Sequence, residues 1–319
     1  MKNRTVFMFL LALFFLFFCI FCTVHPVESS QQIRVGLLPI LDVLPIYVAL
    51  DKGYFELYGL KLDIIPCASA AERDQLLVAG NLDIIINDLV SIALFNKEKT
   101  NVFGIRYAMF PTERFFQFAL IAPRSANILK PQELKGVPIG VSQATIIHYV
   151  TERLLIKEGL KPDEIKIVAI PRIPDRLSAL MRGDLKAACL PDPFASMAII
   201  QGANLILDDR KYPFFSGSLY SVNKNFAEKN PDLIIRFLLS IDRAIADINK
   251  DKERFYDLAI EKRLIPSSLV GKYTIPDFPP KMLPDEKIWQ DVISWLIEKD
   301  LIKKPIPYSD SITGKFLKK

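Results

Sequence analysis

Short apolar segments alternate with longer segments of helical pattern from residue 33 onward, and this alternation constrains the fold more than any other feature of the sequence. Apolar runs of about four to eight residues that end at glycine, proline or a polar residue are typical of buried strands. The expected strands are residues 33–38, 61–65 and 83–86, and the expected helices are residues 43–57, 70–79 and 89–96. Strands and helices in this order favour βαβ units and a mostly parallel sheet.

The same order of segments recurs about a hundred residues later. The expected strands there are residues 137–141, 164–170 and 186–190, and the expected helices are residues 145–158, 174–181 and 194–201. Single residues repeat as well, because Arg73 and Gly80 correspond to Arg176 and Gly183 at a constant spacing of 103 positions. We infer two similar α/β lobes that arose by internal duplication.

The segments between and after these two halves connect them. Residues 101–110 and 115–122 are expected to be strands joined by a Pro-Thr-Glu-Arg turn, residues 218–223 a further strand, and residues 232–249, 252–260 and 285–298 helices. The chain would then cross between the lobes twice. We assign residues 33–118 and 219–319 to lobe I and residues 119–218 to lobe II. Two crossings form a two-strand hinge, which allows the lobes to close around a ligand.

The N-terminus has the pattern of an export signal. Lys2 and Arg4 precede an uncharged apolar run over residues 6–22. A basic start followed by an apolar run is typical of a signal peptide, although this run is long enough to be retained as an anchor. We therefore expect residues 1–29 to be a signal peptide or a membrane anchor, with the remainder of the chain periplasmic or held at the outer face of the membrane. A lipid-attachment motif needs a small residue before its cysteine, but Phe18 precedes Cys19 and Phe21 precedes Cys22, so lipid attachment is the less favoured alternative.

Composition excludes several classes of function. The net charge of +5 is spread along the chain, so a nucleic-acid partner is not expected. Cys67 and Cys189 lie far apart without CxxC spacing, which supports neither a metal site nor a redox motif. With His25 and His148 as the only histidines, no catalytic triad is expected, and no phosphate-binding loop is present. We expect no cofactor and no enzymatic activity.

Several motifs occur in an order that resembles one known family. Residues 53–62 read GYFELYGLKL, residues 77–95 read LVAGNLDIIINDLVSIALF, and residues 134–145 read LKGVPIGVSQAT. LPDPFASMA and KNPDLIIRFLLSIDRAIADIN follow further along the chain. Together they resemble the NMT1/THI5-like and SsuA-like substrate-binding proteins of ABC importers. The resemblance implies a type II periplasmic-binding-protein fold, a small-molecule ligand, an ABC permease as partner and a monomeric protein.

Candidate ligand-binding residues follow from the expected sheet. Ligands of open α/β sheets bind beyond the carboxyl ends of the strands, and with two lobes this places them in the cleft. The residues at those positions are Pro39, Asp42, Leu44, Tyr47, Ser69, Asn87 and Asp88 in lobe I, Tyr107 near the first crossing, and Ser142, Gln143, Thr145, Asp192 and Phe194 in lobe II.

Each candidate also has a purely structural interpretation. Ser142, Thr145, Asp88 and Asp192 precede helices and either cap them or present hydrogen-bonding groups to a ligand. The three aromatic candidates either stack on a flat ring or pack in the core. Arg106 and Arg172 either pair with an anion or face solvent.

The polar candidates indicate a ligand class. Asn87, Asp88 and Asp192 are acceptors for ligand N–H groups, which an aminopyrimidine has and a sulfonate or nitrate lacks. We therefore prefer a thiamine-pyrimidine-like nitrogen heterocycle over an oxyanion. Two alternatives to an importer component are a membrane-anchored extracytoplasmic sensor and a pyrimidine-synthesis enzyme of the THI5 type.

Overall fold

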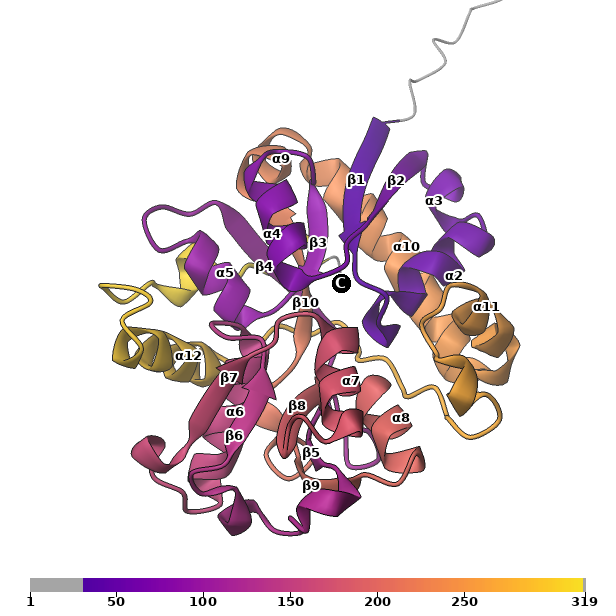
Figure 1. Cartoon of the computed structure of the whole chain (residues 1–319). Helices are drawn as coiled ribbons and strands as arrows, with labels where there is room; N and C mark the ends of the chain where they lie inside the picture. Colours follow the sequence, from indigo (N-terminus) through magenta and orange to yellow (C-terminus); the bar gives the residue numbers. More distant parts are fainter. Residues whose placement is uncertain (1–30, 318–319) are drawn as a thin grey trace, which may run out of the picture.

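The computed structural model describes residues 31–317, which form two sheets flanked by helices (Figure 1). The segment expected to be a signal peptide or anchor, residues 1–29, lies outside the described residues. Within residues 31–317, no helix has both the length and the apolar character that a membrane crossing requires.

The first sheet has the strand order β2-β1-β3-β10-β4. β1 (Gln31–Leu37) pairs in parallel with β2 (Leu60–Pro66) and with β3 (Ile84–Asn87). β10 (Ser218–Asn223) runs antiparallel between β3 and β4 (Val102–Met109). We call the part of the chain that packs on this sheet lobe I.

The second sheet repeats this arrangement in the order β7-β6-β8-β5-β9. β6 (Pro138–Val141) pairs in parallel with β7 (Lys166–Ala169) and with β8 (Ala187–Pro191). β5 (Phe118–Ala122) runs antiparallel between β8 and β9 (Asn204–Asp208). The part built on this sheet is lobe II, and the two similar α/β lobes expected from the sequence are confirmed.

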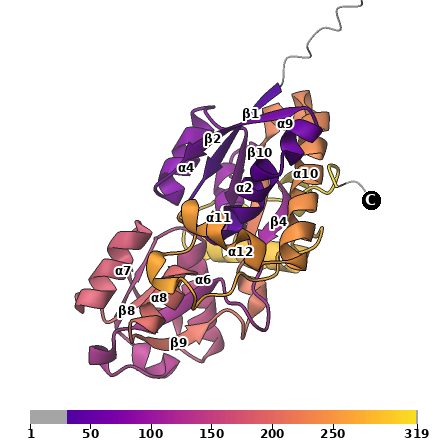
Figure 2. The same cartoon turned by 90° about the vertical axis from the view of Figure 1, so that its right-hand side faces the viewer.

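The chain passes between the sheets twice. β4 and β5 are consecutive in the sequence but belong to different sheets, and so do β9 and β10. The connecting residues 110–117 and 209–217 are short, so they hold the lobes side by side while leaving only two covalent links between the sheets (Figures 1 and 2).

Helices cover both sheets. Their bounds are α2 (Leu44–Asp51), α3 (Tyr54–Leu57), α4 (Ala70–Val78), α5 (Leu89–Phe95), α6 (Ile146–Lys157), α7 (Ile173–Arg182), α8 (Phe194–Ile200), α9 (Lys224–Lys229), α10 (Pro231–Lys250), α11 (Tyr256–Glu261) and α12 (Glu286–Glu298). The single helix expected over residues 43–57 is in fact two, because Gly53 adopts a left-handed conformation with φ of 66° and separates α2 from α3. Strand β9, which the sequence pattern did not predict, forms one edge of the second sheet.

A buried arginine occupies the same place in each lobe. Arg73 on α4 donates from Nη1 to the carbonyl oxygen of Ile86 at 2.7 Å, and Arg176 on α7 donates from Nε to that of Cys189 at 2.9 Å. Both the arginines and their acceptors are 103 positions apart. The repeat seen in the sequence therefore extends to an internal contact that ties a helix to the end of a central strand.

Helix α12 joins the two lobes on one flank of the molecule. It packs against α5 of lobe I, and its Trp295 donates to Glu152 of α6 in lobe II at 2.8 Å. Glu152 is 4% exposed and also contacts His148 Nε2 at 3.1 Å and Lys299 Nζ at 2.7 Å. Burial alone would raise the pKa of Glu152, but the hydrogen bonds from these three side chains outweigh it and lower the pKa to about 2.

Replacement of this carboxylate should change the acid stability of the fold. Above its ordinary pKa near 4, Glu152 is charged in both folded and unfolded chains, and the lowered folded pKa contributes up to about 3 kcal/mol to the free energy of unfolding. We expect Glu152→Gln to lose this amount at pH 7, with the difference from the wild type vanishing as the pH falls from about 4 to about 2. Urea denaturation between pH 7 and about pH 2 measures the free energy of unfolding, with the exposed Glu56→Gln as control. Equal losses of stability in both variants would contradict the prediction.

Candidate functional site

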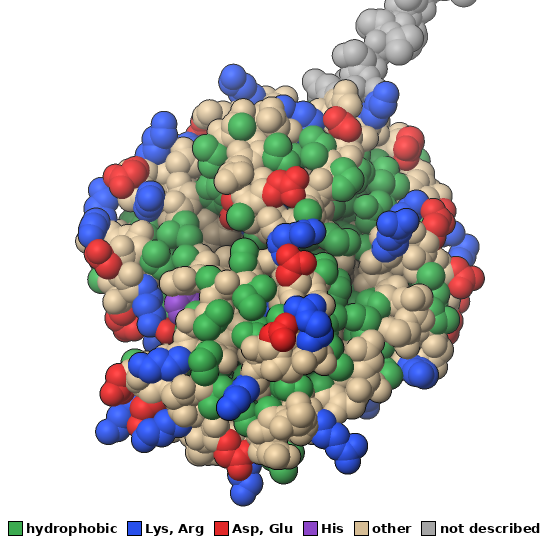
Figure 3. Space-filling view, in the orientation of Figure 1, with side chains coloured by type: hydrophobic (Ala, Val, Ile, Leu, Met, Phe, Trp, Pro, Cys, Tyr) green, Lys and Arg blue, Asp and Glu red, His purple; other side chains and the backbone are tan. Residues whose placement is uncertain are grey.

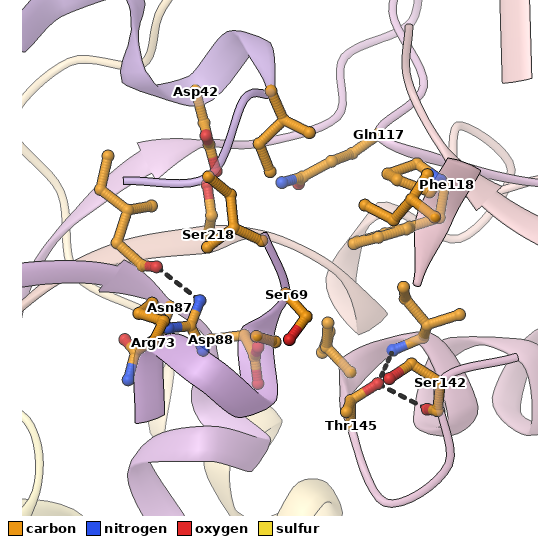
Figure 4. A pocket seen from close by; sticks show the side chains of 18 of the residues that line it. Asp42, Ser69, Arg73, Asn87, Asp88, Gln117, Phe118, Ser142, Thr145 and Ser218 are labelled. Carbon is orange, nitrogen blue, oxygen red and sulfur yellow. Dashed lines mark hydrogen bonds between the residues drawn. The ribbon is translucent and has the colours of Figure 1, made fainter. Parts of the chain in front are cut away.

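A cavity of about 80 Å³ lies between the lobes at the carboxyl ends of their strands (Figure 4). Its lining residues in lobe I are Leu38, Ile40, Asp42, Val43, Ser69, Ala70, Arg73, Ile86, Asn87 and Asp88. The ends of the two connections contribute Gln117 and Gly217, and the strands that follow them, β5 and β10, begin with the lining residues Phe118 and Ser218. The other lining residues, all in lobe II, are Ser142, Thr145, Ile146, Ile147, Pro171, Ile173 and Pro191. Six of the predicted residues are therefore brought together here, namely Asp42, Ser69, Asn87, Asp88, Ser142 and Thr145. Their role in binding stays a prediction.

Three of these six residues cap helices that start at the cavity. Ser69 accepts a hydrogen bond from the amide of Glu72 at 3.2 Å, Asp88 from that of Ser91 at 2.9 Å, and Thr145 from that of Ile147 at 3.2 Å. The structural interpretation weighed for Thr145 and Asp88 is thus present in the fold. Asp88 is 7% exposed, and burial raises its pKa to about 6.

Asn87 is occupied by hydrogen bonds within lobe I. Its side-chain oxygen accepts from the Ser221 hydroxyl at 2.5 Å, and its nitrogen lies 3.4 Å from the Ser91 hydroxyl. Neither group of this amide is therefore left without a protein partner. Asn87 lines the cavity, but its side-chain oxygen is already bonded to Ser221.

Asp42 differs from the other polar residues of the cavity. It lies in the 3₁₀ turn Leu41–Val43 that precedes α2, and it is 5% exposed. The Ser218 hydroxyl lies beside the carboxylate and partly offsets the effect of burial, which raises the pKa of Asp42 to about 6. Yet neither Oδ1 of Asp42 nor Oγ of Ser218 has a partner in hydrogen-bond geometry. An unpartnered buried acceptor is costly, so Asp42 is prepared to receive a donor from the cavity.

Gln117 adds a second free acceptor from the crossing segment. Its Oε1 is buried without a partner, and the end of its side chain points toward the interior of the cavity (Figure 4). Sequence reasoning missed Gln117 and Ser218 because, apart from Tyr107, it considered only residues after parallel strands. Gln117 ends the first connection between the sheets, and Ser218 begins β10 directly after the second. Their positions next to the predicted crossings were the available signal.

Arg73 is the cation of the cavity wall, and its charge is already compensated. Its guanidinium forms an ion pair with Asp74 at 2.7 Å, in addition to the bond to the Ile86 carbonyl. Sequence reasoning recognised Arg73 only as part of the repeat and not as a cavity residue. The remaining wall is mostly aliphatic, with Phe118 as its aromatic member.

Seven predicted residues do not line this cavity. Leu44 and Tyr107 are buried core residues, and Tyr47 and Phe194 are half-buried against core clusters. Pro39 and Gln143 are exposed. The carboxylate of Asp192 bonds to Ser196 and Tyr273. The three aromatic candidates, Tyr47, Tyr107 and Phe194, therefore pack in or against the core, which is one of the two interpretations given for them above. The two arginines considered for anion binding are also engaged elsewhere, Arg106 with Asp242 and Arg172 with Asp175.

The described residues offer no obvious metal site. In residues 31–317, no group of three or more His, Cys, Asp and Glu side chains is placed to hold a metal ion. Cys67 and Cys189 are both buried as free thiols. His148 lies inside α6, where Nε2 contacts Glu152 and Nδ1 accepts from the Ala144 amide at 3.4 Å.

Comparison with known proteins identifies the family. The sequence model of the family described as "NMT1/THI5 like" matches residues 41–254, and the chain belongs to this family. The expected resemblance is thereby confirmed.

Two sequence relatives share a description. A protein of Escherichia coli (strain K12) described as binding aliphatic sulfonates is 25% identical over 154 residues, which cover 48% of this chain and 48% of that protein. A protein of Bacillus subtilis (strain 168) with the same description is 22% identical over 313 residues, covering 92% and 89%. The chain thus spans about half the length of the Escherichia coli relative that it matches.

Solved structures confirm the two-lobed periplasmic-binding-protein fold. The alkanesulfonate-binding protein SsuA from Xanthomonas axonopodis pv. citri, bound to MOPS, superposes with a TM-score of 0.75 at 16% identity, covering 90% of this chain and 99% of that chain. The desulfurization enzyme DSZB also shares the fold, with a TM-score of 0.67 at 14% identity and coverage of 90% and 97%. At such identities the likeness concerns the fold alone.

The buried carboxylate of Asp42 should cost stability. Because its folded pKa of about 6 exceeds its ordinary value near 4, ionisation above pH 4 favours the unfolded chain. We expect Asp42→Asn to raise the free energy of unfolding at pH 7 by up to about 3 kcal/mol, and we expect this gain to vanish as the pH falls from about 6 to about 4. Urea denaturation at pH 7 and at about pH 4 tests this prediction, and the exposed Asp51→Asn, which should show no such gain, is the control. An Asp42→Asn protein that is less stable than the wild type at pH 7 would refute it.

Proposed function

We propose that this protein is the extracytoplasmic substrate-binding component of an ABC importer and captures a small organic molecule in the cavity between its lobes. Three observations support the proposal: membership of the NMT1/THI5-like family, the binding roles in the descriptions of its relatives, and a cavity walled by both lobes. The basic and apolar N-terminus adds support for export. An ABC permease is the proposed partner, and the capturing unit is a monomer.

The free acceptor of Asp42 carries the proposal about the ligand. A buried carboxylate oxygen without a protein partner favours a ligand that brings an N–H donor. Gln117 supplies a second free acceptor, and the aliphatic wall with Phe118 suits the faces of a flat ring. A nitrogen heterocycle resembling the pyrimidine of thiamine combines these properties.

The size of the cavity requires movement of the lobes. A cavity of about 150 Å³ is known to hold benzene, whereas this one measures about 80 Å³. A ring-sized ligand therefore needs the lobes to adjust, which two covalent links between the sheets permit. Apolar side chains are common along the waist between the lobes, whereas charged side chains are prominent at the periphery (Figure 3).

An oxyanion is the competing ligand class. The start of α6, which meets the cavity at Ser142, Thr145 and Ile146, favours such a ligand. The charges of the opposite wall oppose it, since Asp42 and Asp88 contribute two carboxyl groups and the guanidinium of Arg73 is paired with Asp74. We therefore keep the preference for a donor-bearing heterocycle.

The two alternative functions make different demands. A membrane-anchored sensor would retain the N-terminal segment and lack permease and ATPase genes nearby. A pyrimidine-synthesis enzyme would turn over its substrate, yet the one histidine among the described residues, His148, does not line the cavity. Neither alternative explains the free acceptors of the cavity better than ligand capture does.

A thermal-shift panel tests the function and the ligand class together. The panel contains the aminopyrimidine moiety of thiamine, flavin precursors, taurine and other sulfonates, nitrate and bicarbonate. At a hundredfold excess over Kd, a bound ligand should raise the free energy of unfolding by about 2.7 kcal/mol. We expect a shift with the aminopyrimidine that Asp42→Asn abolishes and Asp51→Asn preserves.

Other outcomes of the panel would count against the proposal. A shift with sulfonates or nitrate alone would overturn the preference for a heterocycle while supporting capture. A complete lack of shifts would remove the support for ligand capture by this cavity.

A further inference from the structure

Tyr273 lies on a long loop between α11 and α12 that is fastened to lobe I on both sides of the tyrosine. Before it, the hydroxyl of Tyr256 donates to the carbonyl of Leu269 at 3.1 Å. After it, Asn249 of α10 forms two hydrogen bonds with the backbone of Phe278, at 2.9 and 2.8 Å. Leu269 and Phe278 are both buried in the core cluster of lobe I. The position of Tyr273 is therefore fixed relative to lobe I.

The partner of Tyr273 belongs to lobe II. Asp192 follows β8 and precedes α8, and it is 7% exposed. Its Oδ1 accepts from the amide and hydroxyl of Ser196, at 3.3 and 2.5 Å. Its Oδ2 accepts from the hydroxyl of Tyr273. The bonds to Ser196 in the first turn of α8 thus account for one carboxylate oxygen, and the contact between the lobes accounts for the other.

The equivalent turn of lobe I has a different environment. Asp88 follows β3 as Asp192 follows β8, and it caps α5 by accepting from the amide of Ser91. Asp88, however, lines the cavity, whereas Asp192 does not. Of these two related aspartates, only Asp192 is bonded to a side chain of the opposite lobe. Asp192, predicted from the sequence as a ligand acceptor, is thus engaged in a contact across the cleft.

Apolar packing accompanies this hydrogen bond. Met197 on α8 packs against the core clusters of both lobes, and the 3₁₀ turn Ser267–Leu269 lies against α8. Asp192 is buried, and a hydrogen bond from a hydroxyl to a buried carboxylate is stronger than one at an exposed site. The contact lies on the flank opposite to α12, which joins the lobes separately (Figures 1 and 2).

We propose that Tyr273 and Asp192 form a latch that stabilises the closed arrangement of the lobes and slows release of the captured ligand. The effect on ligand release rests on the proposed function, whereas the effect on lobe closure does not. Neither residue lines the cavity, so both are positioning residues that act on the ligand through the movement of the lobes. A latch of this kind lowers the dissociation rate of the ligand and has little effect on its association rate.

Lobe separation in the absence of ligand tests the latch directly. Spin labels on Gln75→Cys of α4 and Ser178→Cys of α7 report the width of the cleft, because both positions are exposed and lie on opposite lobes. The native Cys67 and Cys189 are buried, and Cys19 and Cys22 are changed to serine. We expect Tyr273→Phe to reduce the ratio of closed to open molecules about tenfold, the amount typical of one hydrogen bond to a charged group.

Tyr54→Phe is the matched control. It also removes a hydrogen bond from a tyrosine to an aspartate, but both Tyr54 and its partner Asp247 lie in lobe I. The control should leave the distribution of distances unchanged. If Tyr273→Phe and Tyr54→Phe give the same distribution as the wild type, the latch is refuted.

Dissociation of the aminopyrimidine moiety of thiamine provides the second measurement. Tyr273→Phe and Asp192→Asn should each raise its dissociation rate about tenfold, change its association rate little, and show non-additive effects in the double variant. Fully additive effects would overturn the pairing of the two residues. If no compound of the panel binds, the proposed function fails, and the spin-label distances still decide whether the latch exists.

Discussion

The structure depends on the two connections that hold the carboxyl edges of two similar sheets face to face. Each sheet alone presents an edge at which helices begin and strand ends leave polar groups available. The connections at residues 110–117 and 209–217 bring those edges together, add Gln117 to the wall and place Ser218, the first residue of β10, beside it. The cavity thus arises from placing two similar lobes against each other, and Gln117 on one connection and Asp42 beside Ser218 provide its unpartnered acceptors.

Much of this arrangement could be predicted from the sequence, because the information is local. Strand ends after apolar runs located Asp42, Ser69, Asn87 and Asp88, and capping residues located Thr145. Three features could not be obtained in this way. The break at Gly53 depends on a backbone conformation, strand β9 completes an edge set by distant strands, and Asp192 meets Tyr273 across 81 positions of the chain. The last two depend on contacts between distant parts of the chain, and the first on a left-handed conformation that glycine permits but does not require.

The segments after β10 have a larger part in joining the lobes than the sequence pattern indicated. On one flank α12 contacts α5 and holds Glu152 of lobe II, while on the other the loop of Tyr273 reaches Asp192. The first contact centres on a carboxylate whose pKa is lowered by three donors, and the second on one whose pKa burial raises to about 6. Trp295 and Lys299 of the α12 segment both donate to Glu152, whereas Asp192 accepts from Tyr273, so the α12 flank has more hydrogen bonds between the lobes.

The two buried arginines show where the repeated lobes have diverged. In lobe I the charge of Arg73 is balanced by Asp74, whereas in lobe II the corresponding position is Leu177 and Arg176 has no ion pair among the described residues. Burial lowers the pKa of Arg176 to about 10, which leaves it charged at neutral pH. Arg176 does not line the cavity, so the charged groups of the cavity, Asp42, Asp88 and Arg73, all come from lobe I, and lobe II contributes only uncharged residues. The donor-bearing ligand proposed above would therefore turn its donors toward the wall of lobe I, where Asp42 and Asp88 lie.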